Sequence, residues 1–143
     1  MDNKHLVWEI IRIGRGHRKL IEREITKLGI HPSQHHLLMY LAKNGESTQC
    51  SIAQAMEISA ATVAVSLKKL EKGKYIEKKP SSEDNRVNYI TLTTKGEEVV
   101  RQSQQLFEAT DEALFEKLSD AEREQFHMFL ERIIENIKTM EEK

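Results

Sequence analysis

Apolar residues recur every three or four positions through residues 5–28, which predicts a helix with one apolar face. Gly14 and Gly16 are expected to weaken this helix locally, because glycine loses more backbone freedom than other residues on becoming helical. Gly29 is expected to end it. Its apolar positions are Leu6, Val7, Ile10, Ile11, Ile13, Leu20, Ile21, Ile25 and Leu28.

Three shorter helices are predicted next, each with a recognisable start. His31-Pro32-Ser33 begins the second, with proline at its first helical position, and Asn44-Gly45 ends it. Thr48 is expected to cap the third helix and Ser59 the fourth, because a side-chain oxygen there accepts a backbone N–H of the first turn. Gly73 ends the fourth helix.

A hairpin is predicted after the fourth helix. Residues 76–79 and 87–92 alternate between apolar and polar positions, as the two strands of a hairpin do. Ser-Ser-Glu-Asp-Asn-Arg, residues 81–86, forms the turn between them. Two helices with a tight turn, followed by a basic-tipped hairpin, make a winged helix-turn-helix, a fold that points to duplex DNA.

Two long helices are predicted after the wing, starting at capping boxes in which Thr94 precedes Glu97 and Ser119 precedes Glu122. With the first helix, they carry more apolar surface than a small winged domain can cover, which predicts a homodimer. Their apolar positions are Val99, Val100, Leu106, Phe107, Ala113, Leu114 and Leu118, and then Phe126, Phe129, Leu130, Ile133, Ile134, Ile137 and Met140.

The predicted fold class is mainly α with a small β-hairpin wing, in one domain over residues 1–143. Residues 31–96 are expected to form the winged helix DNA-binding lobe, and residues 1–30 and 97–143 the dimerisation helices. A cytoplasmic location is expected, because no apolar run approaches the ~18 residues of a membrane span and no signal-peptide core is seen. A single cysteine also favours a reducing compartment.

The formal net charge of −1 conceals an uneven distribution. Residues 60–95 hold eight Lys or Arg and four acids, whereas residues 101–143 hold six and eleven. A basic middle and an acidic end predict that one face meets phosphate while another stays away from it. The alternative is that both are ordinary solvated faces.

The fourth helix is expected to read DNA with small side chains. If Val63, Leu67 and Leu70 face the core, the groove-facing set lacks the long bidentate readers of guanine. Small residues pack against thymine methyls, so an A/T-rich half-site is predicted. The alternative is that the alanines are simply good helix formers. The groove-facing set is Ser59, Ala60, Ala61, Thr62, Ser66 and Lys69.

Arg86, at the hairpin tip, is expected to enter a narrow minor groove, where the potential is most negative. Asp84, two residues earlier, can orient the guanidinium by a charge-assisted bond. The alternative is a surface salt bridge of little energetic weight. Phosphate contacts are expected from lysines and from two helix starts. These residues are Lys68, Lys72, Lys78, Lys79, Ser33, Gln34, Thr48 and Gln49.

Several short motifs together resemble the MarR family of winged-helix transcriptional regulators. They are His31-Pro32-Ser33-Gln34, Thr48-Gln49 with Ile52-Ala53, Ile58-Ser59 with Thr62-Val63, Leu70-Glu71, Tyr75-Ile76-Glu77-Lys78, and Asp84-Asn85-Arg86 with Ile90-Thr91-Leu92-Thr93 and Gly96. The resemblance implies a homodimeric winged helix whose outer helices dimerise. Its fourth helix would enter the major groove and its wing arginine the minor groove. It also implies a repressor released by a small molecule, by oxidation or by metal.

Two positions depart from the family pattern. Val65 stands where the recognition helix usually carries an arginine, so the base specificity of other family members is not expected to apply to this chain. The glycine usual before the first wing strand falls on Lys74, with Gly73 one residue earlier, which suggests a slightly different turn.

A mostly apolar ligand pocket is predicted between the dimer helices and the winged lobe, where the resemblance places inducers. The alternative is that its residues are core or dimer-seam positions. The candidate lining is Trp8, Ile11, Arg15, His17, Met39, Tyr40 and Phe107.

Cys50 lies in the first turn of the third helix, where a helix start can activate a thiol, so a redox switch is an alternative. The resemblance disfavours it, because oxidant sensors of the family usually carry the reactive cysteine in the first helix. His31 and His35 are four apart and can share a helix face. No Cys, Asp or Glu lies nearby in sequence, so no metal and no cofactor are expected. His17 and His127 are expected to be partly buried.

The predicted function is a sequence-specific DNA-binding transcriptional regulator, a homodimeric repressor on a palindromic A/T-rich operator that an effector releases. Its partners would be double-stranded DNA, a second copy of the chain and a small-molecule effector, with no membrane. One alternative is a redox- or metal-responsive regulator of the same fold, and another a helical interaction module that does not bind DNA. An enzyme is not expected, because the chain has no Gly-x-Ser-x-Gly, no Cys/His motif and no phosphate-cradling glycine loop.

Overall fold

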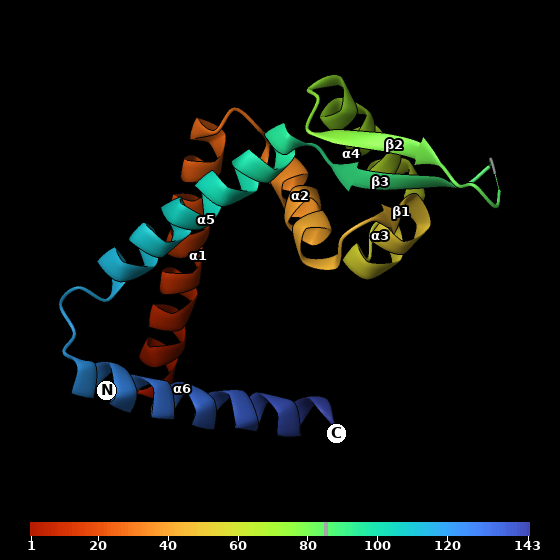
Figure 1. Ribbon diagram of the computed structural model, residues 1–143. Helices are drawn as coiled ribbons and strands as arrows, with labels where there is room; N and C mark the ends of the chain where they lie inside the picture. The colour runs from red at the N-terminus through yellow and green to blue at the C-terminus, as the bar shows by residue number, and fades with distance from the viewer. Residues whose placement is uncertain (85) are drawn as a thin grey trace. The chain divides into compact units, whose positions relative to one another are not determined.

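The computed structural model describes residues 1–84 and 86–143, and in these it confirms a mainly helical chain with a small antiparallel sheet (Figure 1). Contacts divide it into two compact units, Met1–Phe107 and Glu108–Lys143. The elements are α1 (Asn3–Lys27), α2 (Pro32–Asn44), β1 (Ser47–Thr48), α3 (Gln49–Met56), α4 (Ala60–Lys72), β2 (Ile76–Pro80), β3 (Asn88–Leu92), α5 (Thr94–Leu114) and α6 (Asp120–Glu141).

The predicted hairpin is confirmed, and it belongs to a three-stranded antiparallel sheet in the order β1-β3-β2 (Figure 1). In the register of β2 and β3, Ile76 lies opposite Leu92, and Lys78 opposite Ile90. The two-residue strand β1 pairs Ser47 with Ile90 and was not predicted, because a strand of two residues shows no alternation.

The predicted caps at Thr48, Ser59 and Ser119 each accept a backbone N–H of their own first turn. The predicted helix start at His31 is also confirmed, and the His31 side chain acts as the cap there. The predicted capping box at Thr94 is wrong. The hydroxyl of Thr93 instead accepts the Gly96 N–H, with 3.1 Å between Oγ1 and N. Thr94 is already helical, whereas a cap must stand just outside the helix it closes.

The bounds of two helices differ from expectation. α1 continues through Gly14 and Gly16, so their low helix propensity does not interrupt it. α5 ends at Leu114, and Leu118, predicted on the same helix, lies in the turn before α6. Gly29 follows α1 with a φ of +84°, which agrees with its predicted role as the stop.

The hydrophobic core lies in the first unit and joins every helix from α1 to α5 to the sheet. The predicted stripe of α4, Val63, Leu67 and Leu70, is fully buried there. Burying each such side chain stabilises the fold by about 1.5–3 kcal/mol relative to leaving it in water. The other buried apolar residues are Ile25, Ile30, Leu37, Leu38, Leu41, Ile52, Ile76, Ile90, Val99 and Val100.

The second unit has no buried residue within the single chain. Its long helix α6 exposes an apolar stripe that includes Phe126, Phe129, Ile133 and Ile137, and Phe129 is 47% exposed. An amphipathic helix is stable when its apolar face is covered, so α6 requires a surface against which to pack.

Among the residues that the structure describes, no single helix has the length and apolar composition of a membrane span. Only α3 and α4 taken together meet that criterion, across a bend of 117°.

The turn after α4 contains a lysine in a backbone conformation that favours glycine. Lys74 has a φ of +63°, in the left-handed region. A side chain there costs about 1–2 kcal/mol, because its Cβ crowds the following carbonyl oxygen. The position where the family resemblance expects glycine therefore has a glycine-like conformation although it carries lysine.

Lys74→Gly is expected to raise the free energy of unfolding by about 0.5–1 kcal/mol, since relief of the left-handed strain exceeds the added freedom of the unfolded chain. Thermal unfolding measures this. Lys74→Ala is the matched control, because it removes the same charge but keeps the Cβ. Equal melting temperatures for the two variants would contradict the strain.

His35 is a buried titratable residue in the contact between α2 and α5. It is 5% exposed, and its ring meets Phe107 edge to face with 5.4 Å between ring centres. Burial, and then the neighbouring His36, lower the pKa of His35 from 6.5. Within the described part of the chain its Nε2 has no hydrogen-bond partner.

Because the pKa of His35 is lowered by folding, the unfolded chain takes up its proton at a higher pH. The contribution of His35 to stability is therefore complete above pH 6.5 and falls as the pH drops from there toward its folded-state pKa. In chemical unfolding from pH 7.5 down to about 5, His35→Leu is expected to flatten this decline. The exposed His127→Gln should retain the wild-type slope, and a His35 variant with that slope would disprove the assignment.

Candidate nucleic-acid interface

The pair α3 and α4 has the geometry of a helix-turn-helix. α3 ends at Met56 and is capped by Glu57, whose φ is +54°, and Ser59 already caps α4, so only Ile58 lies between the two capping residues. The helices meet at a bend of 117°, within the range of about 90–120° for this motif. The Ser59 hydroxyl accepts the Thr62 N–H at 3.1 Å and lies 2.8 Å from the Thr62 hydroxyl, which orders the first turn of α4.

The outward face of α4 is mostly as predicted. Ser59, Ala60, Ala61, Thr62 and Lys69 are exposed. Ser66 is an exception: it is half-buried, because it stands three residues after Val63 and four before Leu70, at the edge of the buried stripe.

Val65 was missing from the predicted groove-facing set and is 56% exposed. Together with Ala61, Lys68 and Lys72 it forms one stripe at spacings of four, three and four residues. The spacing opposite the buried stripe is the signal that identifies Val65. We call these four residues the α4 reading stripe; it presents two small apolar side chains followed by two cations.

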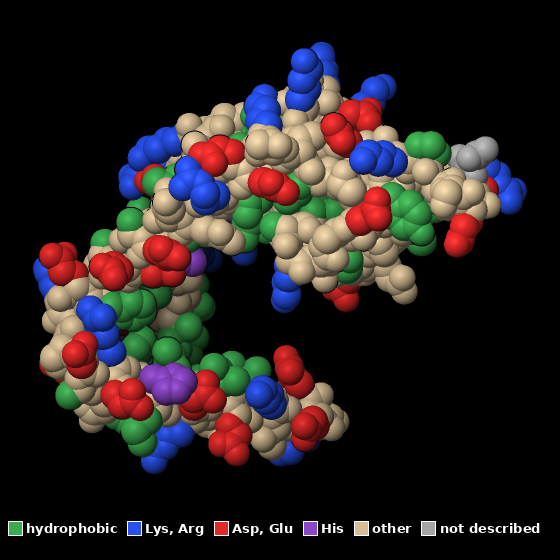
Figure 2. All heavy atoms as spheres, in the orientation of Figure 1, with side chains coloured by type: hydrophobic (Ala, Val, Ile, Leu, Met, Phe, Trp, Pro, Cys, Tyr) green, Lys and Arg blue, Asp and Glu red, His purple; other side chains and the backbone are tan. Residues whose placement is uncertain are grey.

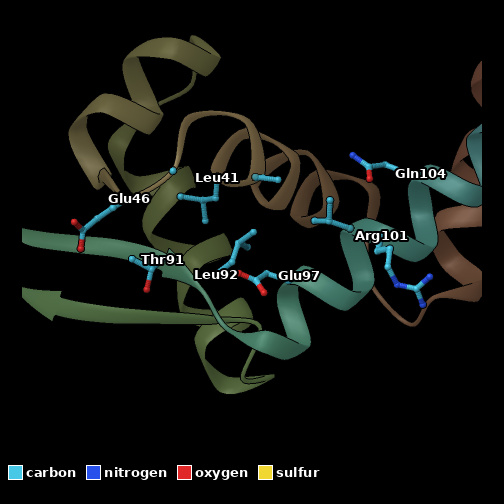
Figure 3. Close-up of a pocket in the computed structure, with 10 residues that line it drawn as sticks. Leu41, Glu46, Thr91, Leu92, Glu97, Arg101 and Gln104 are labelled. Atoms are coloured by element: carbon cyan, nitrogen blue, oxygen red, sulfur yellow. The ribbon is translucent and has the colours of Figure 1, made fainter.

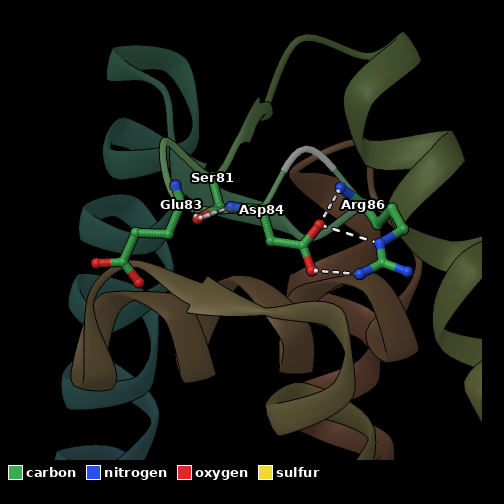
Figure 4. Close-up of polar contacts among 4 residues, drawn as sticks. All are labelled: Ser81, Glu83, Asp84 and Arg86. Carbon is green, nitrogen blue, oxygen red and sulfur yellow. Dashed lines mark hydrogen bonds and ion pairs between the residues drawn. The ribbon is translucent and has the colours of Figure 1, made fainter.

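The wing tip is ordered by bonds from side chains to backbone (Figure 4). The Ser81 hydroxyl accepts the backbone N–H groups of Glu83 and Asp84 at 3.2 and 3.4 Å. The Asp84 carboxylate accepts the backbone N–H of Arg86 at 3.0 Å and its guanidinium at 3.2 and 3.4 Å. The predicted orienting bond is therefore present; Asn85 lies outside the described residues.

Arg86 remains available to a partner despite this ion pair. Its side chain is 90% exposed. The pKa of the Asp84 carboxyl is lowered first by the Arg86 backbone N–H and then by its side chain, so the carboxylate stays ionised. An exposed pair of this kind contributes little stability, so its main effect is to limit the directions in which the guanidinium points.

Cationic side chains gather along α4 and the wing strand β2 (Figure 2). Lys68, Lys72 and Lys79 are exposed and Lys78 is half-buried, so all four lysines predicted to contact phosphate lie at or near the surface.

Three of the four predicted helix-start amides already have partners within the chain. The Ser33 N–H donates to His31 Nδ1 at 3.2 Å, and the Gln34 N–H donates to the His31 carbonyl at 3.0 Å. The Thr48 N–H likewise donates to Ser51 Oγ at 3.1 Å. These three amides are used in local capping, and so are the side chains of the same residues. The contact between the Gln49 N–H and phosphate stays a prediction.

The predicted ligand-pocket residues separate into two groups. Met39, Tyr40 and Phe107 are half-buried against the core. Trp8, Ile11, Arg15 and His17 are exposed on α1, where Ile11 and Arg15 line a shallow groove of 680 Å³. The partial burial expected for His17 and His127 is wrong, because both are exposed in the single chain.

A different groove, of 390 Å³, opens between the end of α2, strand β3 and the start of α5 (Figure 3). Apolar Leu41, Leu92 and Val100 line it, and Glu46 and Glu97 bring carboxylates to the same lining. No motif in the sequence marked it, because its walls come from segments up to about sixty residues apart. Among the described residues, no group of three or more His, Cys, Asp or Glu is placed to hold a metal ion.

A helix-turn-helix with a basic wing defines the class of winged helix proteins, and comparison with known proteins agrees. The sequence model of the MarR family matches residues 28–86. The transcriptional regulator ZitR of Lactococcus lactis is 30% identical over 125 residues, covering 85% of this chain and 86% of ZitR.

Solved structures give the same result. A glycine-to-lysine mutant of S. aureus MepR superposes with a TM-score of 0.88 at 26% identity, over 96% of this chain and 99% of MepR. The S. aureus MepR–DNA complex matches with a TM-score of 0.76 at 26% identity, over 92% and 98% of the two chains. The chain belongs to the MarR family of winged-helix regulators.

Proposed function

We propose that this protein is a homodimeric repressor that binds a palindromic, A/T-rich operator and is released by an effector. The observation that carries the proposal is the α4 reading stripe, in which Ala61 and Val65 stand exposed beside Lys68 and Lys72. The similarity to a MepR–DNA complex supports duplex DNA as the partner.

The chemistry of the stripe favours thymine. Aliphatic side chains in the major groove contact the C5-methyl of thymine, whereas guanine is read mainly by arginine or lysine through two hydrogen bonds. Val65 places a branched aliphatic group in the middle of the stripe. Lys68 and Lys72 lie one to two turns further along α4, where they suit the phosphate backbone.

The wing adds a preference for the same sequences. A/T-rich tracts have a narrow minor groove with an enhanced negative potential, which attracts an inserted arginine. Arg86 is exposed at the hairpin tip and oriented by Asp84. Both readers therefore favour A/T pairs, one through methyl groups and the other through groove width.

The exposed apolar faces support the homodimer. α1 exposes Trp8, Ile10 and Ile13, and α6 exposes Phe129 and Ile133. A second copy supplies the same kind of surface in return, and such an isologous contact gives a two-fold axis that matches a palindromic site. We therefore assign residues 1–30 and 97–143 to dimerisation and residues 31–96 to DNA binding, in one cytoplasmic regulator.

The effector is proposed to bind where it can change the position of the DNA-binding residues 31–96 relative to the dimerisation helices. Exposed α1 residues, such as Ile11 and Arg15, belong to one candidate surface, and the 390 Å³ groove at the start of α5 is another. Coupling must be reciprocal, so an effector that releases DNA must bind the free protein more tightly than the DNA complex. No catalytic activity is part of the proposal.

Selection of bound sequences from a random pool of duplex DNA tests this function directly. Recovery of an A/T-rich inverted repeat that binds two chains is the expected result. A motif dominated by G·C contacts would overturn the proposed readout, and one chain on an unrepeated site would overturn the homodimer. Absence of binding to any duplex would favour a helical interaction module.

Arg86→Ala is expected to weaken binding to the selected operator about ten- to a hundredfold, as for other arginines that contact bases. Electrophoretic mobility or fluorescence anisotropy measures the loss. Arg101→Ala is the matched control, because Arg101 is also an exposed arginine in a local ion pair, with Glu98 on α5.

Replacement of the A/T pairs under the wing by G·C pairs should reduce the effect of the Arg86 variant, because the groove is then wider. Equal losses for Arg86→Ala and Arg101→Ala would contradict a specific wing contact.

A further inference from the structure

The turn after α4 is bonded to the start of α5, although about twenty residues of wing separate them in sequence. The Thr93 N–H donates to the Tyr75 carbonyl at 3.1 Å, and the Thr93 hydroxyl donates to the Lys74 carbonyl at 2.6 Å. The Lys95 ammonium donates to the Gly73 carbonyl at 2.7 Å. We call residues 73–75 and 93–96 the α4–α5 joint.

Gly96 permits this close approach. A Cβ at Gly96 would lie 2.1 Å from the Tyr75 carbonyl oxygen, which is a backbone atom and cannot rotate away. Any side chain at this position would therefore push the two segments apart. The family motif ends on this glycine, and the packing of the joint accounts for it without any DNA contact.

Lys95 holds the joint on its outer side. Gly73 is the C-cap of α4, and its carbonyl lies at the helix end, where the backbone dipoles leave a partial negative charge that a cation stabilises. The same ammonium lies over the Tyr75 ring, 4.4 Å from its centre. The ring in turn packs on Gly73, where an added Cβ would come within 2.7 Å of a ring carbon. One cation thus contacts both the C-cap of α4 and Tyr75, two residues further along the chain.

We propose that Lys95 is a positioning residue for DNA recognition, acting with Thr93 and Gly96 to fix the direction of α4 relative to α5. The proposal rests on the proposed function. In a dimer built through the outer helices, the separation of the two α4 helices is transmitted through α5 and hence through this joint. A loosened joint would let each α4 take several directions, which weakens binding and broadens the range of operator spacings that fit.

The test uses duplexes that carry the two selected half-sites at a series of separations. Wild type is expected to prefer one separation. Lys95→Met, which keeps the length of the side chain and removes the ammonium, should bind the preferred duplex about tenfold more weakly, as expected for loss of a charged hydrogen bond and a cation–π contact. It should also discriminate less between separations. Lys95→Arg should restore both, because arginine can donate to the carbonyl and stack on the ring.

The control variant is Lys74→Met, because the bonds of Lys74 in the joint are made by its backbone, which this substitution keeps. It removes the same charge from the same turn but not the contact of Lys95 with Gly73. Its spacing preference should remain that of wild type. Thermal unfolding of each variant shows that the chain is folded before binding is compared. Tyr75→Leu gives an independent reading, because it loosens the joint without changing the charge and should broaden the spacing preference in the same way.

Salt dependence distinguishes positioning from a direct phosphate contact. Loss of one phosphate contact lowers the log–log salt slope by about 0.9, whereas a positioning role leaves it unchanged. A lower slope for Lys95→Met, with Tyr75→Leu behaving like wild type, would overturn the proposal in favour of a phosphate contact. Unchanged affinity and spacing preference in Lys95→Met would also overturn it. Failure of the wild-type protein to select any duplex is a different result, because it rejects the proposed function itself.

Discussion

Burial of one stripe of α4 is the constraint on which the rest of the structure depends. Val63, Leu67 and Leu70 occupy the centre of the core, where α2, α3 and the sheet surround them. Turning α4 by a quarter of its circumference would move these side chains toward water and bring Lys68 or Lys69 toward the core, at a cost of several kcal/mol. The outward face of the helix is therefore set by the core, and the side chains available for recognition are those that the core does not need.

Around this core, the functional loops are held by specific polar bonds. At the wing tip, Ser81 and Asp84 replace the missing ladder bonds with bonds from side chain to backbone. At the α4–α5 joint, Thr93 and Lys95 donate to the carbonyls of Lys74 and Gly73, in the turn that follows α4. The wing and the end of α4 are therefore held in a defined conformation although they are exposed. This suits surfaces that are proposed to bind DNA.

The outer helices show the opposite situation, since they carry apolar side chains in excess of what the chain can cover. α6 has no buried residue, yet it is long and amphipathic. Such a surface supports the proposed homodimer, because burial of apolar area is the main driving force of protein association. Trp8 and Ile11, predicted to line a ligand pocket, are exposed for the same reason, because they belong to an apolar face of α1 that the single chain does not cover.

The sequence by itself determined the features that depend on neighbours within four residues. Helix starts at Pro32, the Thr48 and Ser59 caps, the buried stripe of α4 and the hairpin are set by local spacing and capping, and the structure confirms them. Only the tertiary structure decided that Thr93 and not Thr94 caps α5, and that Ser47 and Thr48 pair with β3. It alone joins Lys95 to Gly73 and brings Gly96 against the carbonyl of Tyr75. The physical reason is range: periodicity records which face of one element is apolar, whereas a joint or groove depends on how distant segments pack in space.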